Sequence, residues 1–380
     1  MLQNIKHPML QNKTCTGNIT SPPSTVSGEM SHVSASGAQG AHTHTGSLAM
    51  SPCGDRAQHM KAWEACVRSK WVLRTIQHGY RLQFRTAPPM FREIVYSHAR
   101  GEAAQILQGE IATLLMKGAV RIVPPDQSHA GFYSRYFLVP KKGTQALRPI
   151  LDLRALNKYL RKFTFRMLTY PTLLRFVCPG DWFTTVDLTD AYYHIKIYPP
   201  HSKYLRFAFQ GVAYEFLKLP FGLSLSLRTF VKCTEAALAP LREKGIRIVT
   251  FVDDLAVACQ SEALAKEHTT ALVEHLTALG FSINYKKSVL SPTQTVSYLG
   301  LSLNSITFRA HLSRERIDKF NLCLAHFQRD KVIPFRVCLR LLGLMASALV
   351  VVRLGRLYMR DLQRWVASLR LDQYVTLAEK

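Results

Sequence analysis

Two short apolar runs joined by a pair of acids form the most informative pattern in the chain. Residues 246–252 and 255–259 are dominated by apolar side chains, which predicts two short and largely buried strands. The chain can turn between them only at Asp253 and Asp254. We therefore predict a β-hairpin with two carboxylates at its tip, although the turn lacks the Gly that two-residue hairpins prefer.

This acid pair has two interpretations. Adjacent carboxylates at the end of buried strands repel each other and are costly to desolvate, and a divalent cation such as Mg²⁺ would relieve both costs. A solvated surface turn is the simpler explanation when the pair is taken alone. The rest of the chain has to distinguish a metal site from a surface turn.

Helical and strand patterns alternate along the remaining sequence. A 3.6-residue apolar period predicts helices over about 97–117, from the loop at 219–226 to about Leu241, after Ser261, and from Ser313 onward. Short apolar segments predict strands at 120–123, 135–139 and 182–186, a hairpin over 208–219 around Gly211, and a hairpin strand over 296–303. This mixture predicts an α+β fold.

Composition limits the class of protein. The chain has 380 residues, 47% of them hydrophobic, and a net charge of +24. Such a surplus favours a polyanionic partner, nucleic acid before an acidic membrane. The longest apolar run, over 341–352, is too short to span a bilayer, so we expect no membrane partner.

The cysteines and the N-terminal segment indicate a cellular setting. Eight cysteines are scattered without a CxxC pair, which argues against a zinc knuckle or a disulfide framework and favours a reducing compartment. A signal-peptide pattern is absent, so we expect an intracellular protein, cytoplasmic and/or nuclear, that is not secreted. Residues 1–62 are rich in Ser, Thr, Gly and His, which predicts a disordered tail.

Three further segments carry candidate chemistry. The basic loop at 140–149 presents Lys141, Lys142 and Arg148, which suit phosphates but also fit a solvated turn. Asp187 ends an apolar strand and either caps the following turn or belongs to a second acidic site. The Pro/Gly loop at 219–226 opens a helix whose free N–H groups could face an anion or a base.

Several motifs occur together from about Trp71 to the C-terminus. They are a VD strand end followed by DAYY, an FVDD hairpin, a YLG strand, and the segments SRYFLVPKK, LRPILDLRALNK, PGDWF, LRFAFQGVAYEF, LPFGLSLSLRTFVKC and LQRW. With this set the sequence resembles the reverse transcriptases of DIRS-like retrotransposons, which carry a tyrosine recombinase. The resemblance implies a right-hand polymerase fold with fingers, a palm built on an antiparallel sheet, and a helical thumb or connection region.

The resemblance also implies an activity and its cofactors. The expected function is RNA-directed DNA polymerisation, in which a nucleotide passes from a dNTP to a primer 3′-hydroxyl on an RNA or DNA template. Two Mg²⁺ ions, with Mn²⁺ as a substitute, assist this transfer in the family. The alternative is a catalytically inactive, nucleic-acid-binding remnant of such an element.

Residue roles follow from the same resemblance. Asp187, Asp253 and Asp254 are the expected catalytic and metal-binding acids, with the first two as principal ligands. The expected nucleotide-binding residues are Lys141, Lys142, Arg148, Asp190, Tyr192 as the steric gate, and Phe221 where retroviral enzymes place Gln. Tyr298, Leu299 and Gly300 match the primer grip.

The resemblance implies a division of the chain. We expect a tail over 1–62, fingers and palm over 63–310, and a basic thumb or connection region over 311–380. A ribonuclease H domain of the family would begin where this sequence stops, so we expect the chain to be a fragment or truncated frame. Other parts of the element's polyprotein are then expected partners.

Overall fold

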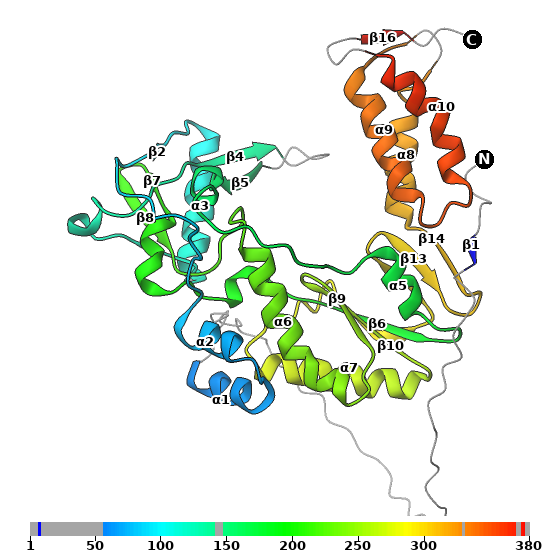
Figure 1. Cartoon of the computed structure of the whole chain (residues 1–380), viewed down its shortest axis with the longest axis horizontal. Coiled ribbons are helices and arrows are strands. Elements are labelled where there is room, and N and C mark those ends of the chain that lie inside the picture. The colour runs from blue at the N-terminus through cyan, green and yellow to red at the C-terminus, as the bar shows by residue number, and fades with distance from the viewer. Residues whose placement is uncertain (1–6, 9–55, 141–146, 329–330, 370–373, 377–380) are drawn as a thin grey trace, which may run out of the picture. The chain divides into compact units, whose positions relative to one another are not determined.

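This computed structural model describes residues 7–8, 56–140, 147–328, 331–369 and 374–376. The predicted α+β class is confirmed, because antiparallel sheets and helices alternate along the chain (Figure 1). No helix within these residues is both long and apolar enough to cross a bilayer.

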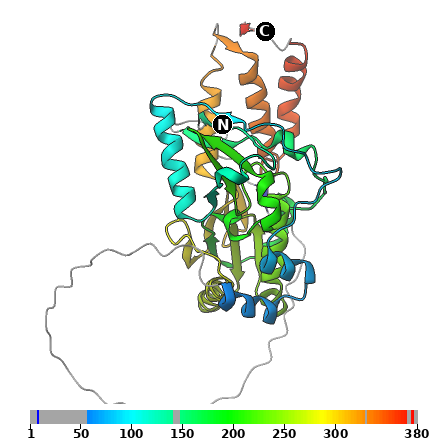
Figure 2. The same cartoon turned by 90° about the vertical axis from the view of Figure 1, so that its left-hand side faces the viewer.

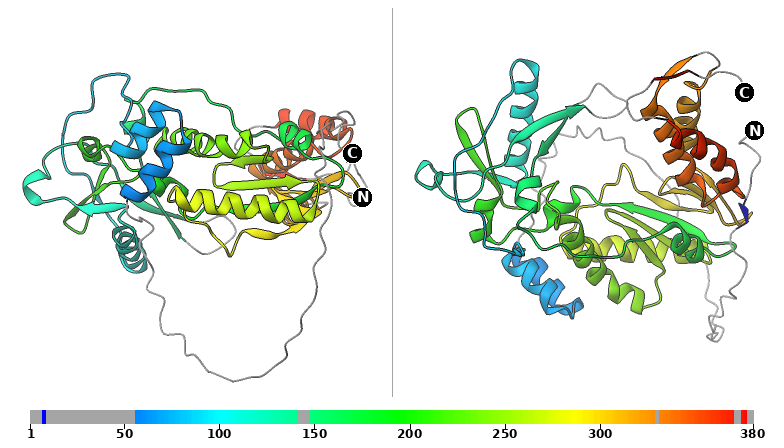
Figure 3. Two further views of the ribbon diagram at one scale, coloured as in Figure 1. Left: turned by 90° about the horizontal axis from the view of Figure 1, so that it is seen from below. Right: turned by 45° about the horizontal axis from the view of Figure 1, so that its top comes forward.

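The central sheet has four antiparallel strands in the order β11-β6-β10-β9. Their bounds are Val289–Thr293, Trp182–Asp187, Asp254–Cys259 and Ile248–Phe251. Two long helices, α6 (Ser226–Glu243) and α7 (Glu262–Ala278), contact these strands (Figure 3). Ser261 caps α7, as the sequence predicts, by accepting a hydrogen bond from the Leu264 N–H.

Both faces of the central sheet are buried, which explains the nearly continuous apolar character of its strands. Val186, Leu255 and Val257 join the main core with residues of α6 and α7. Phe183 and Ala256 belong to a second core on the other side. Side chains alternate between the two cores along each strand, so a shift of one residue in register would exchange every buried group.

A second sheet has the order β2-β7-β8-β3, in which only the β2–β7 pair is parallel. Its strands are Tyr96–Ser97, Arg206–Phe209, Val212–Phe216 and Val120–Ile122. The β7–β8 hairpin turns at Gln210 and Gly211, which both have positive φ, as a type I′ turn requires. The predicted hairpin around Gly211 is therefore confirmed.

Other elements surround these sheets. The hairpin β4–β5 covers Tyr136–Pro140 and Leu147–Leu151. The helices are α1 (Arg56–Cys66), α2 (Lys70–His78), α3 (Glu102–Met116), α4 (Arg154–Asn157) and α5 (Tyr170–Phe176). Short 3₁₀ turns lie at Pro125–Gln127 (η2), Ala191–His194 (η3) and Pro199–Tyr204 (η4).

The helix α1 begins at Arg56, seven residues before the expected boundary at residue 63. Trp63 is buried, and its indole N–H donates to the Leu279 carbonyl beyond the end of α7 (2.9 Å). Figure 2 shows the first two helices, in blue, beside the yellow-green helix α7. Packing against the core therefore orders this helix. The predicted tail otherwise lies almost entirely outside the described residues.

The C-terminal part begins with a sheet in the order β1-β14-β13-β12 and continues into helices. The strands are His7–Pro8, Arg309–Leu312, Leu301–Asn304 and Thr295–Tyr298. The helices are α8 (Arg314–Leu324), α9 (Phe335–Ala348) and α10 (Gly355–Ala367), and a short pair, β15 (Val332–Pro334) and β16 (Tyr374–Thr376), accompanies them. The expected helical character after Ser313 is confirmed.

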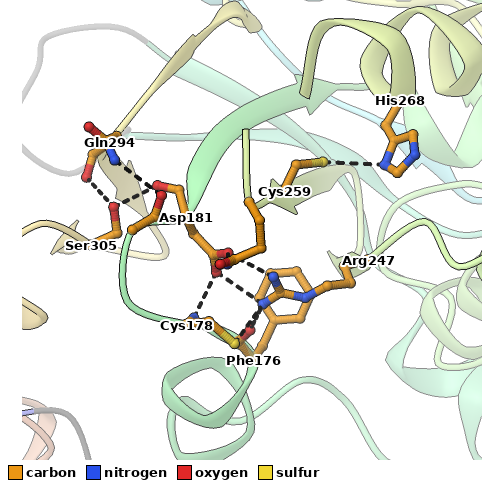
Figure 4. Close-up of polar contacts among 10 residues, drawn as sticks. Phe176, Cys178, Asp181, Arg247, Cys259, His268, Gln294 and Ser305 are labelled. Atoms are coloured by element: carbon orange, nitrogen blue, oxygen red, sulfur yellow. Dashed lines mark hydrogen bonds and ion pairs between the residues drawn. The ribbon is translucent and has the colours of Figure 1, made fainter. Parts of the chain in front are cut away.

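A buried polar network anchors the start of β6 (Figure 4). Asp181 is fully buried and accepts hydrogen bonds from Arg247 (2.7 and 3.0 Å) and from Gln260. Arg247 also donates to the Phe176 carbonyl, and the Ser305 hydroxyl donates to the Asp181 carbonyl (2.6 Å). The network therefore joins the end of α5, the ends of three strands of the central sheet and the β13–β14 turn.

Candidate active site

The structure brings the three predicted acids together at one end of the central sheet. Asp254 is the first residue of β10 and lies directly opposite Asp187, the last residue of β6. Asp253 lies in the β9–β10 turn, where its carbonyl accepts a hydrogen bond from the Leu188 N–H (3.0 Å). Acids far apart in the sequence thus meet because two strands pair in a fixed register.

The hairpin turn differs by one residue from the prediction. The turn residues are Val252 and Asp253, while Asp254 already pairs with Phe251 in the ladder. Val252 has a φ of 60°, which is unusual for a β-branched residue. Its side chain packs against the main core, which holds the backbone in this conformation. Of the two acids, only Asp253 lies in the turn, and Asp254 is held in the sheet by its pairing with Phe251.

Burial and neighbouring negative charge perturb the carboxyl groups of Asp253 and Asp254. The pKa of Asp254 is raised to about 6, first by burial and then by the negative charges of Asp253 and Asp187. Burial, followed by the charge of Asp187, also raises the pKa of Asp253. Lys287 opposes both shifts. The site therefore concentrates more negative charge than its own surroundings neutralise.

This charge suits divalent cations, although the acids do not form a closed protein cage. Within the described residues, no group of three or more His, Cys, Asp or Glu side chains is placed so that together they could hold a metal ion. Mg²⁺ in phosphoryl-transfer sites takes only one or two carboxylates and completes its shell with substrate phosphates and water. An open set of half-buried, mutually repelling carboxylates fits that kind of site.

Among the residues predicted to contact a nucleotide, the structure describes the side chains of Asp190, Tyr192 and Phe221. The ring of Tyr192 lies 4.8 Å from that of Phe221, which is 58% exposed, and burial followed by the charge of Asp253 raises the Tyr192 pKa. Asp190 has a φ of 51° and forms an ion pair with Lys117 (2.9 Å). The aromatic pair and Asp253 thus share one local environment.

The basic loop can be placed only in part. Lys141 and Lys142 lie outside the described residues. Arg148 belongs to β5, where it pairs with Val139 of β4, but its side chain is also outside what the structure describes. The predicted phosphate contacts of these three residues therefore remain predictions.

Tyr298 is the last residue of β12, and Leu299 and Gly300 form the tight turn that leads into β13. Leu299 and Gly300 both have positive φ, of 51° and 75°. The Tyr298 side chain is buried, and its hydroxyl donates to the Asp254 carbonyl (2.9 Å). The Leu299 carbonyl accepts a hydrogen bond from the Tyr170 hydroxyl (3.1 Å). The Tyr298 hydroxyl therefore holds the backbone of β10 at Asp254.

Several supporting residues were missed by sequence reasoning. The Ser288 hydroxyl accepts a hydrogen bond from the Asp187 N–H (3.0 Å), and Lys117 pairs with Asp190 across more than seventy positions of sequence. Neither contact has a local sequence signal. For Tyr298 a signal existed, because Val296 and Tyr298 alternate with polar residues, which indicates side chains on the buried face.

An antiparallel sheet with these acids at its end, flanked by a strand-rich subdomain and a helical one, defines a right-hand polymerase fold. Residues 139–303 match the family model described as "Reverse transcriptase (RNA-dependent DNA polymerase)". This stretch is similar to the reverse transcriptase domains found in retroviral and retrotransposon Pol polyproteins.

Three similar polyproteins illustrate the relationship. The Gag-Pol polyprotein of Walleye dermal sarcoma virus is 28% identical over 174 residues, which are 45% of this chain and 10% of that protein. The Pol polyprotein from the Drosophila melanogaster transposon gypsy is 27% identical over 217 residues, which are 55% of this chain and 20% of that protein. The Gag-Pol polyprotein of Feline leukemia virus is 29% identical over 234 residues, which are 59% of this chain and 13% of that protein. The match thus spans at most a fifth of each relative.

Solved structures share the fold. The foamy viral protease-reverse transcriptase dRH in complex with double-stranded DNA superposes with a TM-score of 0.64 and 17% identity, covering 84% of this chain and 57% of that one. The foamy viral protease-reverse transcriptase in complex with an RNA/DNA hybrid superposes with a TM-score of 0.60 and 16% identity. The superposition covers 84% of this chain and 44% of that one. The predicted right-hand polymerase architecture is therefore confirmed.

Proposed function

We propose that this chain is an RNA-directed DNA polymerase that adds nucleotides to a primer 3′-hydroxyl. The observation that carries the proposal is the register of β6 and β10, which sets Asp187 opposite Asp254 beside Asp253. Separate strands thereby contribute acids to one site. The match of residues 139–303 to the reverse transcriptase family supports the same conclusion.

The acids have distinct roles in this proposal. Asp187 and Asp253 are the principal ligands of two Mg²⁺ or Mn²⁺ ions, and Asp254 supports them from its fixed place in the sheet. When bound, such ions would lower the pKa of the primer hydroxyl and neutralise the charge of the leaving pyrophosphate. The mutual repulsion of the carboxylates supports this assignment, since cations would relieve it.

The nucleotide would lie against the aromatic pair. Tyr192 is the proposed steric gate under the sugar, and Phe221 the proposed contact with base and template. Asp190 would face the triphosphate and the 3′-hydroxyl, with Lys141, Lys142 and Arg148 neutralising phosphates. Leu299 and Gly300 would touch the primer, while Tyr298 acts through Asp254.

The proposed partners are a primed RNA or DNA template and dNTPs. The net charge of +24 supports a polyanionic partner. Solved enzymes with this fold hold double-stranded DNA or an RNA/DNA hybrid. We further propose fingers and palm over 63–310 and a thumb or connection region over 311–380.

The kind of element and the setting are also proposals. The motifs LRPILDLRALNK and LPFGLSLSLRTFVKC favour a DIRS-like retrotransposon. The cysteines within the described residues are all free thiols, which supports a reducing cytoplasmic or nuclear setting. Reading the flanking genomic frame for ribonuclease H and recombinase segments would test both the element type and the expected polyprotein partners.

Primer extension on poly(A)/oligo(dT) tests the activity. We expect Mg²⁺- or Mn²⁺-dependent incorporation that Asp187→Asn and Asp253→Asn each abolish. Asp361→Asn, which changes a highly exposed acid on α10, is the matched control and should extend normally. Incorporation that survives both active-site substitutions would refute the assignment, and a wild-type protein that binds template-primer without extending it would identify an inactive remnant.

A further inference from the structure

His194, which has no role in the proposed nucleotidyl transfer, lies at the end of the turn that carries Asp190 and Tyr192. It is the last residue of η3. Its Nδ1 lies 3.0 Å from the Ala191 carbonyl oxygen, and its Nε2 lies 2.9 Å from the Ser282 backbone nitrogen. A carbonyl can only accept and an N–H can only donate, so Nδ1 must carry the ring proton and Nε2 must be the acceptor. Both contacts therefore require the neutral imidazole in a single tautomer.

The surroundings of the ring favour this neutral form. Burial is the largest cause and lowers the pKa of His194, and the charge of Lys218 acts in the same direction. The hydrogen bond to the Ala191 carbonyl and the charge of Asp190 act in the opposite direction. The net effect is a lowered pKa, so the ring stays neutral and Nε2 stays an acceptor at neutral pH.

Ser282 holds both ends of the turn. Its N–H donates to Nε2 of His194, and its carbonyl accepts a hydrogen bond from the Thr189 N–H (2.8 Å). Between these two anchors Asp190 has a φ of 51°, a left-handed conformation that needs support from the surrounding structure in a residue other than Gly. The contact between His194 and Ser282 therefore closes residues 189–194 into a loop that is fixed at both ends.

Two core rings form the surface against which this loop packs. The ring of His194 lies 5.2 Å from that of Phe281, and the ring of Tyr192 lies 5.9 Å from that of Phe230. Phe230 and Phe281 contact each other, and both are buried in the main core. The core thus supplies a rigid surface on one side of the loop, while the hydrogen bonds of His194 determine where on that surface the loop lies.

The catalytic acids are held by a different part of the structure. The register of β6 and β10 sets Asp187 opposite Asp254, and His194 takes no part in that ladder. Loss of the His194 contacts should therefore disturb the loop and its tyrosine more than the proposed metal ligands. The expected consequence is a change in nucleotide selection rather than a loss of the chemistry.

We propose that His194 is a positioning residue whose hydrogen bond from Ser282 fixes Tyr192, and thereby determines how strictly the site excludes a nucleotide with a 2′-hydroxyl. The inference rests on the proposed function, in which Tyr192 is the steric gate under the sugar. Such a gate works only if its ring is held within about 0.5 Å of its productive position. His194 itself does not touch the nucleotide and acts through the backbone of the loop.

Binding of dUTP and UTP, which differ only in the 2′-hydroxyl, tests the proposal without requiring chemistry. The full-length protein is bound to a poly(A) template whose oligo(dT) primer ends in a dideoxynucleotide, and the Kd of each nucleotide is measured with Mg²⁺. Wild type should bind dUTP more tightly than UTP. Extension of an unblocked primer, run in parallel, tests the proposed function separately.

Two variants of His194 separate its contacts. Gln can place its amide oxygen near the position of Nε2 and accept from the Ser282 N–H, whereas the shorter Asn can reach only the Ala191 carbonyl. His194→Asn should lower the preference for dUTP by up to about tenfold, the net worth of one hydrogen bond, with little change in dUTP binding itself. His194→Gln should retain most of the wild-type preference.

His275→Asn is the matched control. It removes a similar contact, from Nε2 of a partly buried histidine on α7 to the Ala237 carbonyl of α6 (2.7 Å). A general loosening of the fold would affect this variant and His194→Asn alike. We expect His275→Asn to leave the preference for dUTP unchanged.

Three results would overturn the proposal. They are a wild type that binds dUTP and UTP equally, a preference that is unchanged in His194→Asn, and an equal loss in His194→Gln and His194→Asn, which would assign the effect to ring packing. If wild type extends no primer but shows the His194-dependent preference in the blocked complex, the polymerase proposal fails while this one stands.

Discussion

Removal of one charge from the acidic site should stabilise the metal-free protein while impairing its chemistry. In Asp254→Asn the amide replaces a carboxylate that lies opposite Asp187 and next to Asp253. The amide can also donate a hydrogen bond to Asp187, as the protonated form of Asp254 does. The substitution therefore preserves the contact and removes the repulsion.

The magnitude follows from the raised pKa of Asp254, which moves from 3.8 to about 6. A shift of two pKa units corresponds to roughly 3 kcal/mol for a fully desolvated group. Asp254 is only half-buried, so screening by solvent reduces the expected gain to about 1–1.5 kcal/mol. For a chain of this size that gain is a rise in Tm of about 1–2 °C.

The stability difference between wild type and Asp254→Asn should depend on pH. A carboxyl with a raised pKa holds its proton more tightly in the folded state, so wild-type stability falls as pH rises from about 4 to about 6. The advantage of Asp254→Asn should therefore be absent near pH 4 and complete above pH 6. Mg²⁺ should then stabilise wild type more than the variant.

Thermal unfolding across this pH range, with a chelator and then with Mg²⁺, checks the reasoning. Asp361→Asn on α10 is the control, because that acid is highly exposed and should show no such dependence. A variant that is no more stable than wild type at pH 8 without metal, or whose advantage is constant down to pH 4, would refute the electrostatic account of the site.

Three further substitutions test the supports around the site. Arg247→Met should cost about 3 kcal/mol in urea unfolding, because fully buried Asp181 loses its charged partner. Tyr298→Phe should cost about 1 kcal/mol and slow primer extension without weakening template-primer binding, since the lost hydroxyl holds the Asp254 carbonyl. Weakened primer binding would instead favour a direct primer contact. Gly300→Ala should destabilise by about 1–2 kcal/mol, measured the same way, because its φ is 75° and an added Cβ would lie 2.5 Å from the Arg316 side chain.

Local periodicity was sufficient to find most elements but not the site. The runs that became β6, β9 and β10 are visible as apolar segments, and Ser261 is visible as a helix cap. The pairing of β6 with β10 is a long-range choice that no local pattern specifies. Only the resemblance to a known family indicated beforehand that Asp187 would meet the other acids.

The misplaced turn at the hairpin has a physical cause. A prediction from local preference puts the two acids in the turn, because Val is among the residues least suited to positive φ. The structure places Val252 there because its side chain gains burial in the main core. Tertiary packing thus overrides local preference at the residue that precedes the acids.

This override also explains how the chain tolerates an unfavourable site. Val252 has a backbone in the left-handed region, and three carboxylates repel one another beside it. Each of these features opposes folding. The strands that carry them are buried on both faces, by one core with α6 and α7 and by another with the β12–β13 hairpin. Strong burial on both sides fixes the acids before any cation binds, so binding free energy is not consumed in ordering them. Tyr298 belongs to that second core and bonds to the Asp254 carbonyl, which joins the packing that stabilises the sheet to the group that the chemistry needs.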